Sequence, residues 1–341
     1  MRDRVTSEPV ASRPPTIRTV AARAGVSKSL VSLVLKNSPN VSEPKRQAVL
    51  KAVAELGYRP DPVARSLAER RTRTVGVVID DLSNPWYVAL LDGLRPVLHR
   101  HGLRPLLADG HTEPDAVQAL SDLRVDGLVL VGTPSPSAAE QVNALGNQIP
   151  TVVAGTREPR LSAVDVVAND DYRGAQLATS HLLELGHRRI AHIVGEGEVG
   201  RLRRAGYEAV MADAGLEPRC VTGDWTEATG HRVATGLLRS SDRATAIVAA
   251  NDLSAIGVLA AADDLGLRVP EDLSVVGYDD TWFARLQRLS LTTINSHITE
   301  VGEVAGRTLT ARIDGERGTA GTRLLFPALV ERSSTGPAPA D

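Results

Sequence analysis

The chain has 341 residues, 42% of them hydrophobic and 23% charged, a balance typical of a globular protein with two or three domains. Its single cysteine, Cys220, excludes an internal disulfide and favours a reducing, cytoplasmic location over a secreted, disulfide-stapled fold. No apolar run is long enough to span a membrane, and residues 1–15 lack the apolar core of a signal peptide.

The net charge of −2 is unevenly distributed along the chain. Residues 1–73 contain fifteen Lys and Arg against six Asp and Glu, whereas the remainder contains twenty-four against thirty-five. A basic head on an acidic body is typical of a polyanion-binding module joined to another unit. Charge alone leaves chance variation of the surface as an alternative.

Three short helices are predicted in the basic head. The first follows a cap at Thr16, the second runs from a cap at Ser27 to about Lys36, and the third follows Ser42 and ends at Gly57. Two short helices joined by a glycine-bearing turn, with a third behind them, predict a helix-turn-helix unit whose second helix enters the major groove of DNA. A small structural three-helix bundle is the alternative.

The second of these helices is predicted to have two different faces. Its apolar face consists of Val31, Val34 and Leu35, and its opposite face of Lys28, Ser29, Ser32 and Leu33. Pro62 then suits the first turn of a further helix over residues 63–68, which is too short to be stable alone in water. That segment is either a helix that needs a partner or a plain linker.

From Thr74 onwards, short apolar strands alternate with helices. Strands are predicted at 75–79, 104–108, 127–131, 151–154 and 163–168, and a second series at 190–194, 246–249, 274–277 and 291–294. This alternation predicts α/β lobes built on parallel sheets, and the two series predict two lobes. Ligands of such folds bind beyond the carboxyl ends of the strands.

The head closely resembles the DNA-binding headpiece of the lactose-repressor (LacI/GalR) family of bacterial transcription regulators. The resemblance is carried by the segment 16–27, by Val31-Ser32 and Val41-Ser42, and by the segment 56–60. It implies that Lys28 and Ser29 read bases, and that residues 61–73 form a hinge in which Leu67 is a minor-groove wedge and Arg65 lies near phosphates. The DNA-contacting set that we predict is Thr16, Ser27, Lys28, Ser29, Ser32, Leu33, Asn37, Tyr58, Arg65 and Leu67.

The body resembles the effector domain of the same family, a periplasmic-binding-protein-like fold with two lobes, a cleft and three crossing strands. The matching segments are 79–85, 124–128, 181–190, 250–253, 269–280 and 291–294. The resemblance places Trp86, Tyr87, Arg203, Trp225, Asn251, Asp279 and Trp282 at the cleft. Aromatic faces stack on rings, and Asn, Asp and Arg fix hydroxyl groups, so a sugar is favoured and a nucleobase is the alternative. Each Trp could instead fill a core.

Two positions depart from the family pattern. Most members carry an arginine where this chain has Leu33, and leucine can touch a thymine methyl group but cannot make the bidentate contact with guanine. Many members carry an aspartate after the strand at 152–153, where this chain has Ala154-Gly155. The first departure puts the usual half-site in doubt, and the second puts one polar contact with the ligand in doubt.

Other functions are less well supported. The segment 195–200 fits the GxGxxG pattern of a nicotinamide-dependent enzyme, but Glu196 and Glu198 are ill suited to lie beside a pyrophosphate. His181, His187 and His192 lack metal-site spacing, and the pairs Asp80-Asp81 and Asp279-Asp280 have no matched nucleophile, so they are interpreted as polar groups at strand ends. An exported sugar-binding protein would carry a leader and no basic head.

We therefore expect a non-enzymatic, ligand-controlled repressor without cofactor or metal. It should bind a pseudo-palindromic double-stranded DNA operator as a homodimer, and it should not associate with a membrane. The expected domains are a disordered tail over 1–15, the headpiece over 16–60, the hinge over 61–73, the two-lobed effector and dimerisation domain over 74–335, and a loose tail over 336–341.

Overall fold

The computed structural model describes residues 15–35, 37–59, 71–81, 84–145, 148–156, 161 and 164–339. The chain forms two compact units, Met1–Thr72 and Arg73–Asp341. In the described parts, no helix is long and apolar enough to cross a membrane. The predicted hinge, with Arg65 and Leu67, lies outside the described residues.

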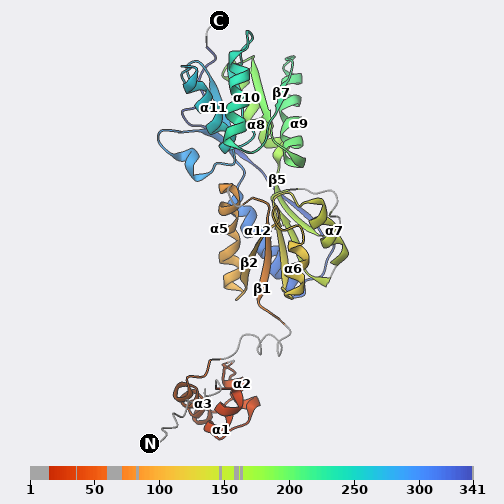
Figure 1. Cartoon of the computed structure of the whole chain (residues 1–341), viewed down its shortest axis with the longest axis vertical. Coiled ribbons are helices and arrows are strands. Elements are labelled where there is room, and N and C mark those ends of the chain that lie inside the picture. Colours follow the sequence, from red (N-terminus) through yellow and green to blue (C-terminus); the bar gives the residue numbers. More distant parts are fainter. Residues whose placement is uncertain are drawn as a thin grey trace, which may run out of the picture. The chain divides into compact units, whose positions relative to one another are not determined.

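In its described residues the first unit has three helices, labelled in Figure 1: α1 (Ile17–Ala24), α2 (Lys28–Leu35) and α3 (Glu43–Leu56). The Thr16 hydroxyl accepts the Thr19 N–H, and the Thr19 hydroxyl accepts the Thr16 N–H, so both ends of a capping box are made. Gly25 ends α1 in the left-handed conformation, with φ 67°, and this turns the chain directly into α2. The core of the unit consists of Val20, Ala21, Val31, Val34, Val41, Val49 and Ala52.

The second unit is built on two six-stranded sheets. The first sheet has the order β11-β5-β4-β3-β1-β2, with all pairs parallel. Its strands are β1 (Thr74–Ile79), β2 (Arg104–Asp109), β3 (Gly127–Val131), β4 (Thr151–Ala154), β5 (Asp165–Asn169) and β11 (Thr322–Leu325). Its helices are α5 (Pro85–Arg100), α6 (Ala116–Asp122), α7 (Pro136–Leu145) and α12 (Ile298–Ile313).

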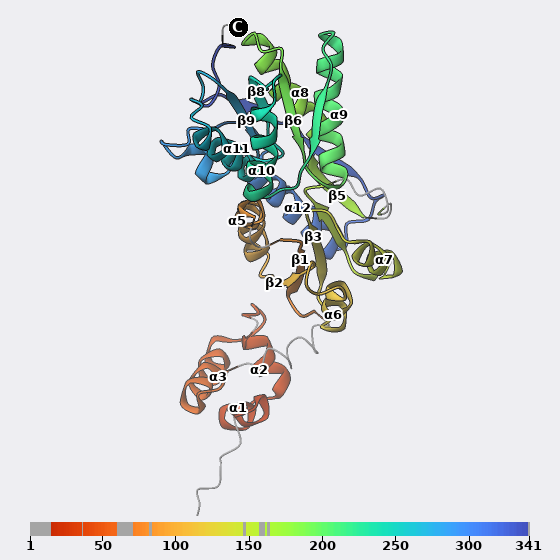
Figure 2. The same ribbon diagram turned by 45° about the horizontal axis from the view of Figure 1, so that its top comes forward.

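The second sheet has the order β12-β10-β9-β8-β6-β7 and is parallel except for its edge strand β12. Its strands are β6 (Ile190–Val194), β7 (Arg219–Thr222), β8 (Ala246–Val248), β9 (Ser274–Tyr278), β10 (Thr292–Asn295) and β12 (Ala328–Val330). Its helices are α8 (Asp171–Glu184), α9 (Gly197–Asp213), α10 (Glu227–Arg239), α11 (Asp252–Asp264) and the 3-10 helix η2 (Trp282–Arg285). Figure 2 shows α8 to α11 around this sheet.

Both faces of each sheet are covered, which explains why the strands are continuously apolar. In β3, Val129 and Val131 point to the core under α5 and α12, whereas Leu128 and Leu130 point to the core under α6 and α7. In the second sheet, Ile193 joins the core that contains α10 and α11 residues. The predicted fold class, a helical headpiece followed by an α/β two-lobed domain, is confirmed.

The chain passes between the two sheets three times. It crosses after β5, after β10 and after β11, because each of these strands lies in one sheet and the next element packs on the other. The carboxyl ends of both sets of parallel strands therefore face the same region. This arrangement brings residues from both lobes to one cavity.

The segment after β12 is held in place, which corrects the expectation of a loose tail from residue 336. The Gly336 N–H donates to Ser274 Oγ over 3.0 Å, and the Ala338 N–H donates to the Leu185 carbonyl over 2.9 Å. His187, which is fully buried, also contacts the Gly336 carbonyl over 3.1 Å. Residues 340–341 lie outside the described part of the chain.

Candidate functional site

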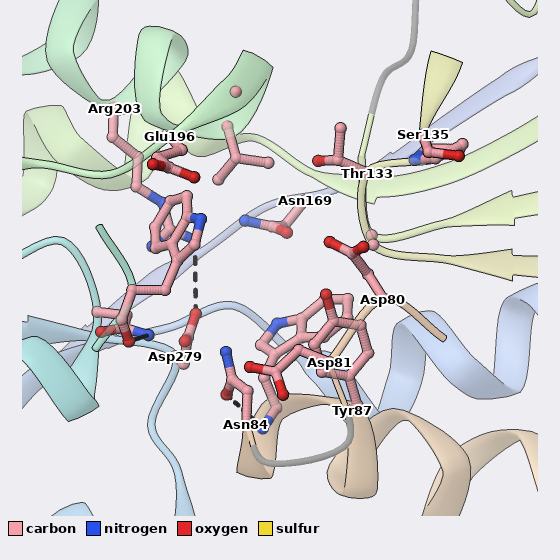
Figure 3. A pocket seen from close by; sticks show the side chains of 18 of the residues that line it. Asp80, Asp81, Asn84, Tyr87, Thr133, Ser135, Asn169, Glu196, Arg203 and Asp279 are labelled. Atoms are coloured by element: carbon pink, nitrogen blue, oxygen red, sulfur yellow. Dashed lines mark hydrogen bonds and ion pairs between the residues drawn. The ribbon is translucent and has the colours of Figure 1, made fainter. Parts of the chain in front are cut away.

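A cavity of about 370 Å³ lies where the carboxyl ends of the strands of the two sheets meet (Figure 3). This volume is near the lower end of the range of roughly 300–1,000 Å³ that is usual for small-molecule sites. The described lining residues follow β1, β3, β4 and β5 of the first sheet and β6, β7, β8 and β9 of the second sheet. A molecule in this cavity would touch both lobes at once.

The wall from the first lobe carries an aromatic pair at the start of α5. The Asn84 side chain caps this helix by accepting the Trp86 N–H over 3.0 Å. The Trp86 and Tyr87 rings pack edge to face, with centroids 5.1 Å apart. Tyr87 is buried, and burial raises the pKa of its hydroxyl above the ordinary value, so it stays protonated.

The wall from the second lobe is centred on Arg203 of α9. Its guanidinium donates to Asp171 over 2.9 Å, to the Ala250 carbonyl over 2.6 Å and to Asp279 over 3.4 Å. It also lies 3.4 Å from the centroid of the Tyr278 ring, in a cation–π contact. Burial acts to lower the pKa of Arg203, but Asp171 and Asp279 raise it, so the group remains charged.

Trp225 completes this wall, because its ring lies 5.3 Å from the Arg203 guanidinium. Asn251 positions Trp225 by donating to its backbone carbonyl over 3.2 Å. The same Asn251 caps α11 by accepting the Ser254 N–H over 2.8 Å. Gly195 provides the space for the indole, since a Cβ at this glycine would lie 2.3 Å from the Trp225 ring. The GxGxxG segment therefore has a packing role here.

Asp279 is held in an uncommon backbone conformation at the end of β9. Its φ is 112°, a region that non-glycine residues rarely adopt, and its N–H donates to the Ile294 carbonyl over 2.8 Å. Burial raises the pKa of the Asp279 carboxyl well above its ordinary range, against the opposing effect of Arg203. Such strain, retained at a cavity wall and paired with a buried cation, is typical of a functional position.

Six of the seven predicted cleft residues line this cavity, and Trp282 does not. The six are Trp86, Tyr87, Arg203, Trp225, Asn251 and Asp279. Trp282 begins η2, is 67% exposed and packs edge to face against Phe283. Its placement at the cleft is therefore corrected. The sequence puts Trp282 only three residues after Asp279, but its side chain lines a neighbouring surface groove that shares Asp279 with the cavity.

Sequence reasoning missed several lining residues as ligand candidates. They are Asn84, Thr133, Ser135, Gly155, Asn169 and Glu196, and Asp80 and Asp81 were noted only as polar groups at a strand end. All of them follow the carboxyl ends of strands or lie there, so the general rule for ligand sites in parallel sheets could have found them. Figure 3 shows Asp80, Asp81 and Tyr87 on one side and Arg203 and Glu196 on the other.

A second candidate surface is the outer face of α2 in the headpiece unit. Lys28, Ser29 and Leu33 are exposed and Ser32 is half-buried, whereas Val31 and Val34 are buried against α1 and α3. Helix α2 is therefore fixed by one face and presents the other, which is the geometry of a recognition helix.

The other predicted DNA-contacting residues that the structure describes have local structural roles as well. The exposed Ser27 side chain caps α2 by accepting the Leu30 N–H over 3.2 Å. Asn37 accepts a hydrogen bond from Arg46 over 3.0 Å, and Tyr58 packs against the core of the unit. Thr16 is exposed and caps α1. These roles leave DNA contact by the same residues as a prediction.

Two known families match the chain. Bacterial regulatory proteins of the lacI family match residues 16–61, and a periplasmic binding protein-like domain matches residues 179–335. The HTH-type transcriptional repressor PurR of Erwinia tasmaniensis is 34% identical over 333 residues, which are 95% of this chain and 98% of the relative. PurR of Proteus mirabilis shows the same identity and coverage.

Solved structures agree with these relatives. The lac repressor dimer bound to operator and the anti-inducer ONPF matches with a TM-score of 0.86 and 29% identity, over 95% of this chain and 100% of that one. The transcriptional regulator CelR in complex with cellobiose matches with a TM-score of 0.71 and 33% identity, over 94% of this chain and 99% of that one.

A helix-turn-helix unit with an exposed recognition face, followed by a two-lobed periplasmic-binding-protein-like domain, defines a DNA-binding regulator and not an enzyme. The 34% identity to PurR, over 95% of this chain, identifies the family to which the chain belongs. This chain belongs to the lacI family of bacterial regulatory proteins and is a DNA-binding transcriptional repressor of that family.

Proposed function

We propose that this repressor acts in the bacterial cytoplasm as a homodimer on a pseudo-palindromic operator, and that a sugar in the interlobe cavity releases it from DNA. The observation that carries the proposal is the cavity itself, which takes its walls from the carboxyl ends of both sheets. A ligand there has different contacts in open and closed arrangements of the lobes. Different affinity for two states is the requirement for a population shift.

The lining supports a sugar. Trp86 and Trp225 offer flat apolar faces, and Asn84, Asp80 and Asp279 offer polar groups for hydroxyls. Among structural neighbours, CelR is in complex with cellobiose, and a regulator from Enterococcus faecium that is 27% identical has bound ribose. A nucleobase also stacks on aromatic rings, so it is included in the test as a competing outcome.

The homodimer is supported by the lac repressor neighbour, which is a dimer bound to its operator. Strand β2 is an edge of its sheet and leaves Leu106 and Leu107 exposed, at 38% and 46%. Two copies related by a twofold axis would present two α2 helices to two half-sites.

The proposal is tested by selecting binding sites from a random double-stranded DNA pool at near-physiological salt, followed by screening of sugars and nucleobases for release. We expect enrichment of a twofold-symmetric site and release by a sugar. An asymmetric single half-site would contradict the dimer, and release by a nucleobase alone would contradict the sugar. If no site is enriched, the selection is repeated with pooled sugars, and a second failure contradicts operator binding.

Asp279→Asn separates ligand response from DNA binding. The substitution keeps the shape but replaces a carboxyl oxygen that a ligand hydroxyl would meet with an amide NH2 group, and a buried hydrogen-bonding group left without its partner costs about 1–3 kcal/mol. We expect the sugar concentration for half-release to rise about 10- to 100-fold while operator affinity in the absence of sugar is unchanged. Asp263→Asn, an exposed acidic residue of α11, is the matched control and should change neither. An unaltered response in D279N would remove Asp279 from the site.

A further inference from the structure

The described lining of the cavity is rich in carboxylates. Asp80, Asp81, Glu196 and Asp279 line it, and among the described lining residues Arg203 is the only Lys or Arg. These carboxylates come from three different strand ends: Asp80 and Asp81 follow β1, Glu196 follows β6, and Asp279 follows β9 (Figure 3). A ligand that enters this space meets more negative than positive charge.

The single arginine does not compensate for this excess, because its donors are committed to the protein. Arg203 binds Asp171, the Ala250 carbonyl and Asp279, and its side chain is 7% exposed. An anionic ligand group could reach the guanidinium only by displacing buried partners. Leaving a buried carboxylate without its cation is strongly unfavourable.

The carboxylate at the opposite wall already experiences a poor environment for charge. Burial raises the pKa of Asp80, and the nearby charge of Asp81 adds to this, although His111 acts in the opposite direction. A phosphate or carboxylate brought close to Asp80 would add a further like charge. A hydroxyl or an ammonium group would instead donate a hydrogen bond to it, which is strong when the acceptor is ionised.

The apolar walls fix the shape of the ligand. Trp86 is seated over Gly155, where a Cβ would lie 2.2 Å from the indole, and Trp225 is seated over Gly195 in the same way. One indole comes from each lobe, so a ring bound in the cavity has an aromatic wall available in both lobes. The face of a tryptophan also attracts a cation.

We propose that the cavity selects a neutral or amino-substituted sugar and rejects phosphorylated and carboxylated sugars. This proposal rests on the sugar-responsive function proposed above and adds the charge class of the ligand. The carboxylates act as acceptors for ligand hydroxyl and ammonium groups, and the two tryptophans hold the ring.

The test uses the full-length chain with Trp282→Phe, so that the two remaining tryptophans, Trp86 and Trp225, report binding by fluorescence. The probes are matched sets of one ring: glucose, glucosamine, glucose 6-phosphate and glucuronate, with the same sets for galactose and mannose, and cellobiose and ribose with their phosphates. We expect a neutral or amino member to bind, and its anionic counterpart to bind at least about tenfold more weakly. The difference should narrow as salt is raised, because salt screens charge.

Asp80→Asn should reduce the difference in affinity between a neutral or amino sugar and its anionic counterpart, because the substitution removes one negative charge from the cavity wall. Glu140→Gln, an exposed carboxylate of α7 in the same lobe, is the matched control and should leave it unchanged. If the anionic sugars bind as tightly as their neutral or amino counterparts, or more tightly, the proposed selection against anionic ligands is wrong. The repressor function is not affected by that outcome. If no sugar changes the fluorescence of a protein that still binds its selected operator, the sugar class itself is overturned. Loss of operator selection, by contrast, contradicts the proposed function.

Discussion

At the scale of single residues, glycine decides how the cavity is lined. Gly155 has φ 103° and lies directly under the Trp86 ring, and Gly132 lies under the Tyr87 hydroxyl, where a Cβ would be 2.6 Å away. Many family members are expected to carry an aspartate where this chain has Ala154-Gly155, and a side chain at Gly155 would collide with the Trp86 ring. An indole replaces the polar contact that the resemblance implied.

Gly155→Ala tests this arrangement. The backbone conformation at this position is one that alanine avoids, and the new Cβ would displace the Trp86 ring. We therefore expect the unfolding free energy to decrease by about 1–3 kcal/mol and the ligand response to weaken. Urea unfolding and sugar-induced release from the operator measure the two effects.

Gly236→Ala is the control for this substitution. Gly236 lies inside α10, and a Cβ there would meet nothing within 4 Å. Alanine should therefore be neutral or stabilise by up to about 1 kcal/mol. If G155A behaves like G236A, the ring of Trp86 is not fixed by the glycine.

At the scale of elements, helix α2 has one buried face and one exposed face, and we predict that the exposed face reads DNA. Val31 and Val34 anchor it, and Leu33 is 42% exposed on the other side. Leucine offers no hydrogen bonds. We therefore predict that a Leu33 placed in the major groove contacts a thymine methyl group and does not bind a guanine.

Leu33→Arg should therefore change the sequence that is selected. We expect a guanine to become enriched at one position of each half-site, with a discrimination of about 1–3 kcal/mol. Site selection by sequencing of the bound DNA measures this. Leu50→Arg introduces the same residue at an exposed leucine of α3, 44% exposed, and should strengthen overall binding without selecting a new base. An identical base preference in both variants would place Leu33 outside the groove.

Helices α5 and α12 lie side by side because glycines face the partner backbone. A Cβ at Gly93 would lie 1.9 Å from the Thr299 carbonyl oxygen, and one at Gly302 would lie 2.0 Å from the Leu90 carbonyl oxygen. Neither helix can yield easily, since both atoms belong to the backbone. The start of α5 carries Trp86 and Tyr87, so this contact positions one wall of the cavity.

Gly302→Ala should force the two helices apart. We expect a loss of about 1–3 kcal/mol or more in unfolding free energy, as in overpacked cores, together with weaker sugar binding. Thermal unfolding and tryptophan fluorescence measure the two effects. Arg307→Ala lies on the exposed face of the same α12 and should lose only a surface ion pair with Glu303, worth less than about 1 kcal/mol. Comparable losses in both variants would show that the close approach is unimportant.

At the scale of the whole molecule, buried histidines give the second lobe a contribution to stability that acid removes. Burial lowers the pKa of His192 to about 4, and its Nδ1 lies 3.0 Å from the Val248 carbonyl, to which the neutral ring donates. Burial also lowers the pKa values of His181 and His187, which contact Thr335 and Gly336 of the C-terminal segment. The core and the C-terminal segment thus both depend on neutral imidazoles.

The sign of the effect follows from the direction of these shifts. Between pH 6.5 and about 4, the unfolded chain binds a proton at His192 that the folded chain does not. The contribution of His192 to the unfolding free energy therefore decreases as the pH is lowered. For His192 alone the loss reaches roughly 3 kcal/mol at the acidic end. Burial raises the pKa of Asp252 to about 6 and that of Asp279 well above its ordinary range, and both shifts act on stability in the opposite direction. Urea unfolding of the wild type and of H192N from pH 7.5 to 4.5 therefore measures the His192 contribution as the difference between the two curves.

His192→Asn should remove the His192 contribution to the pH dependence, since asparagine can still donate to the Val248 carbonyl but does not titrate. His99→Asn, an exposed histidine of α5, is the control and should leave the slope as it is. A slope that is equally steep in H192N would mean that other groups govern the acid sensitivity.

The sequence by itself determined the class of protein, the headpiece helices and most strands, but it did not predict the short strands β7, β11 and β12. The headpiece helices could be located from the spacing of their apolar residues, from the cap at Thr16 and from the terminating glycines Gly25 and Gly57. These signals act over only a few residues. Continuous apolar runs predicted buried parallel strands, and the motifs around them indicated the family. The cleft positions of Trp86, Arg203 and Trp225 came from that resemblance.

Only the tertiary structure decided how the lining residues are used. It committed Arg203 to Asp171, Asp279 and the Ala250 carbonyl, and it carried Trp282 away from the cavity although this residue lies near Asp279 in sequence. It also tied down the segment around Gly336, whose partners Ser274 and His187 are distant along the chain. Local periodicity contains no information about such contacts, because they depend on which strands become neighbours and on how close the backbones approach.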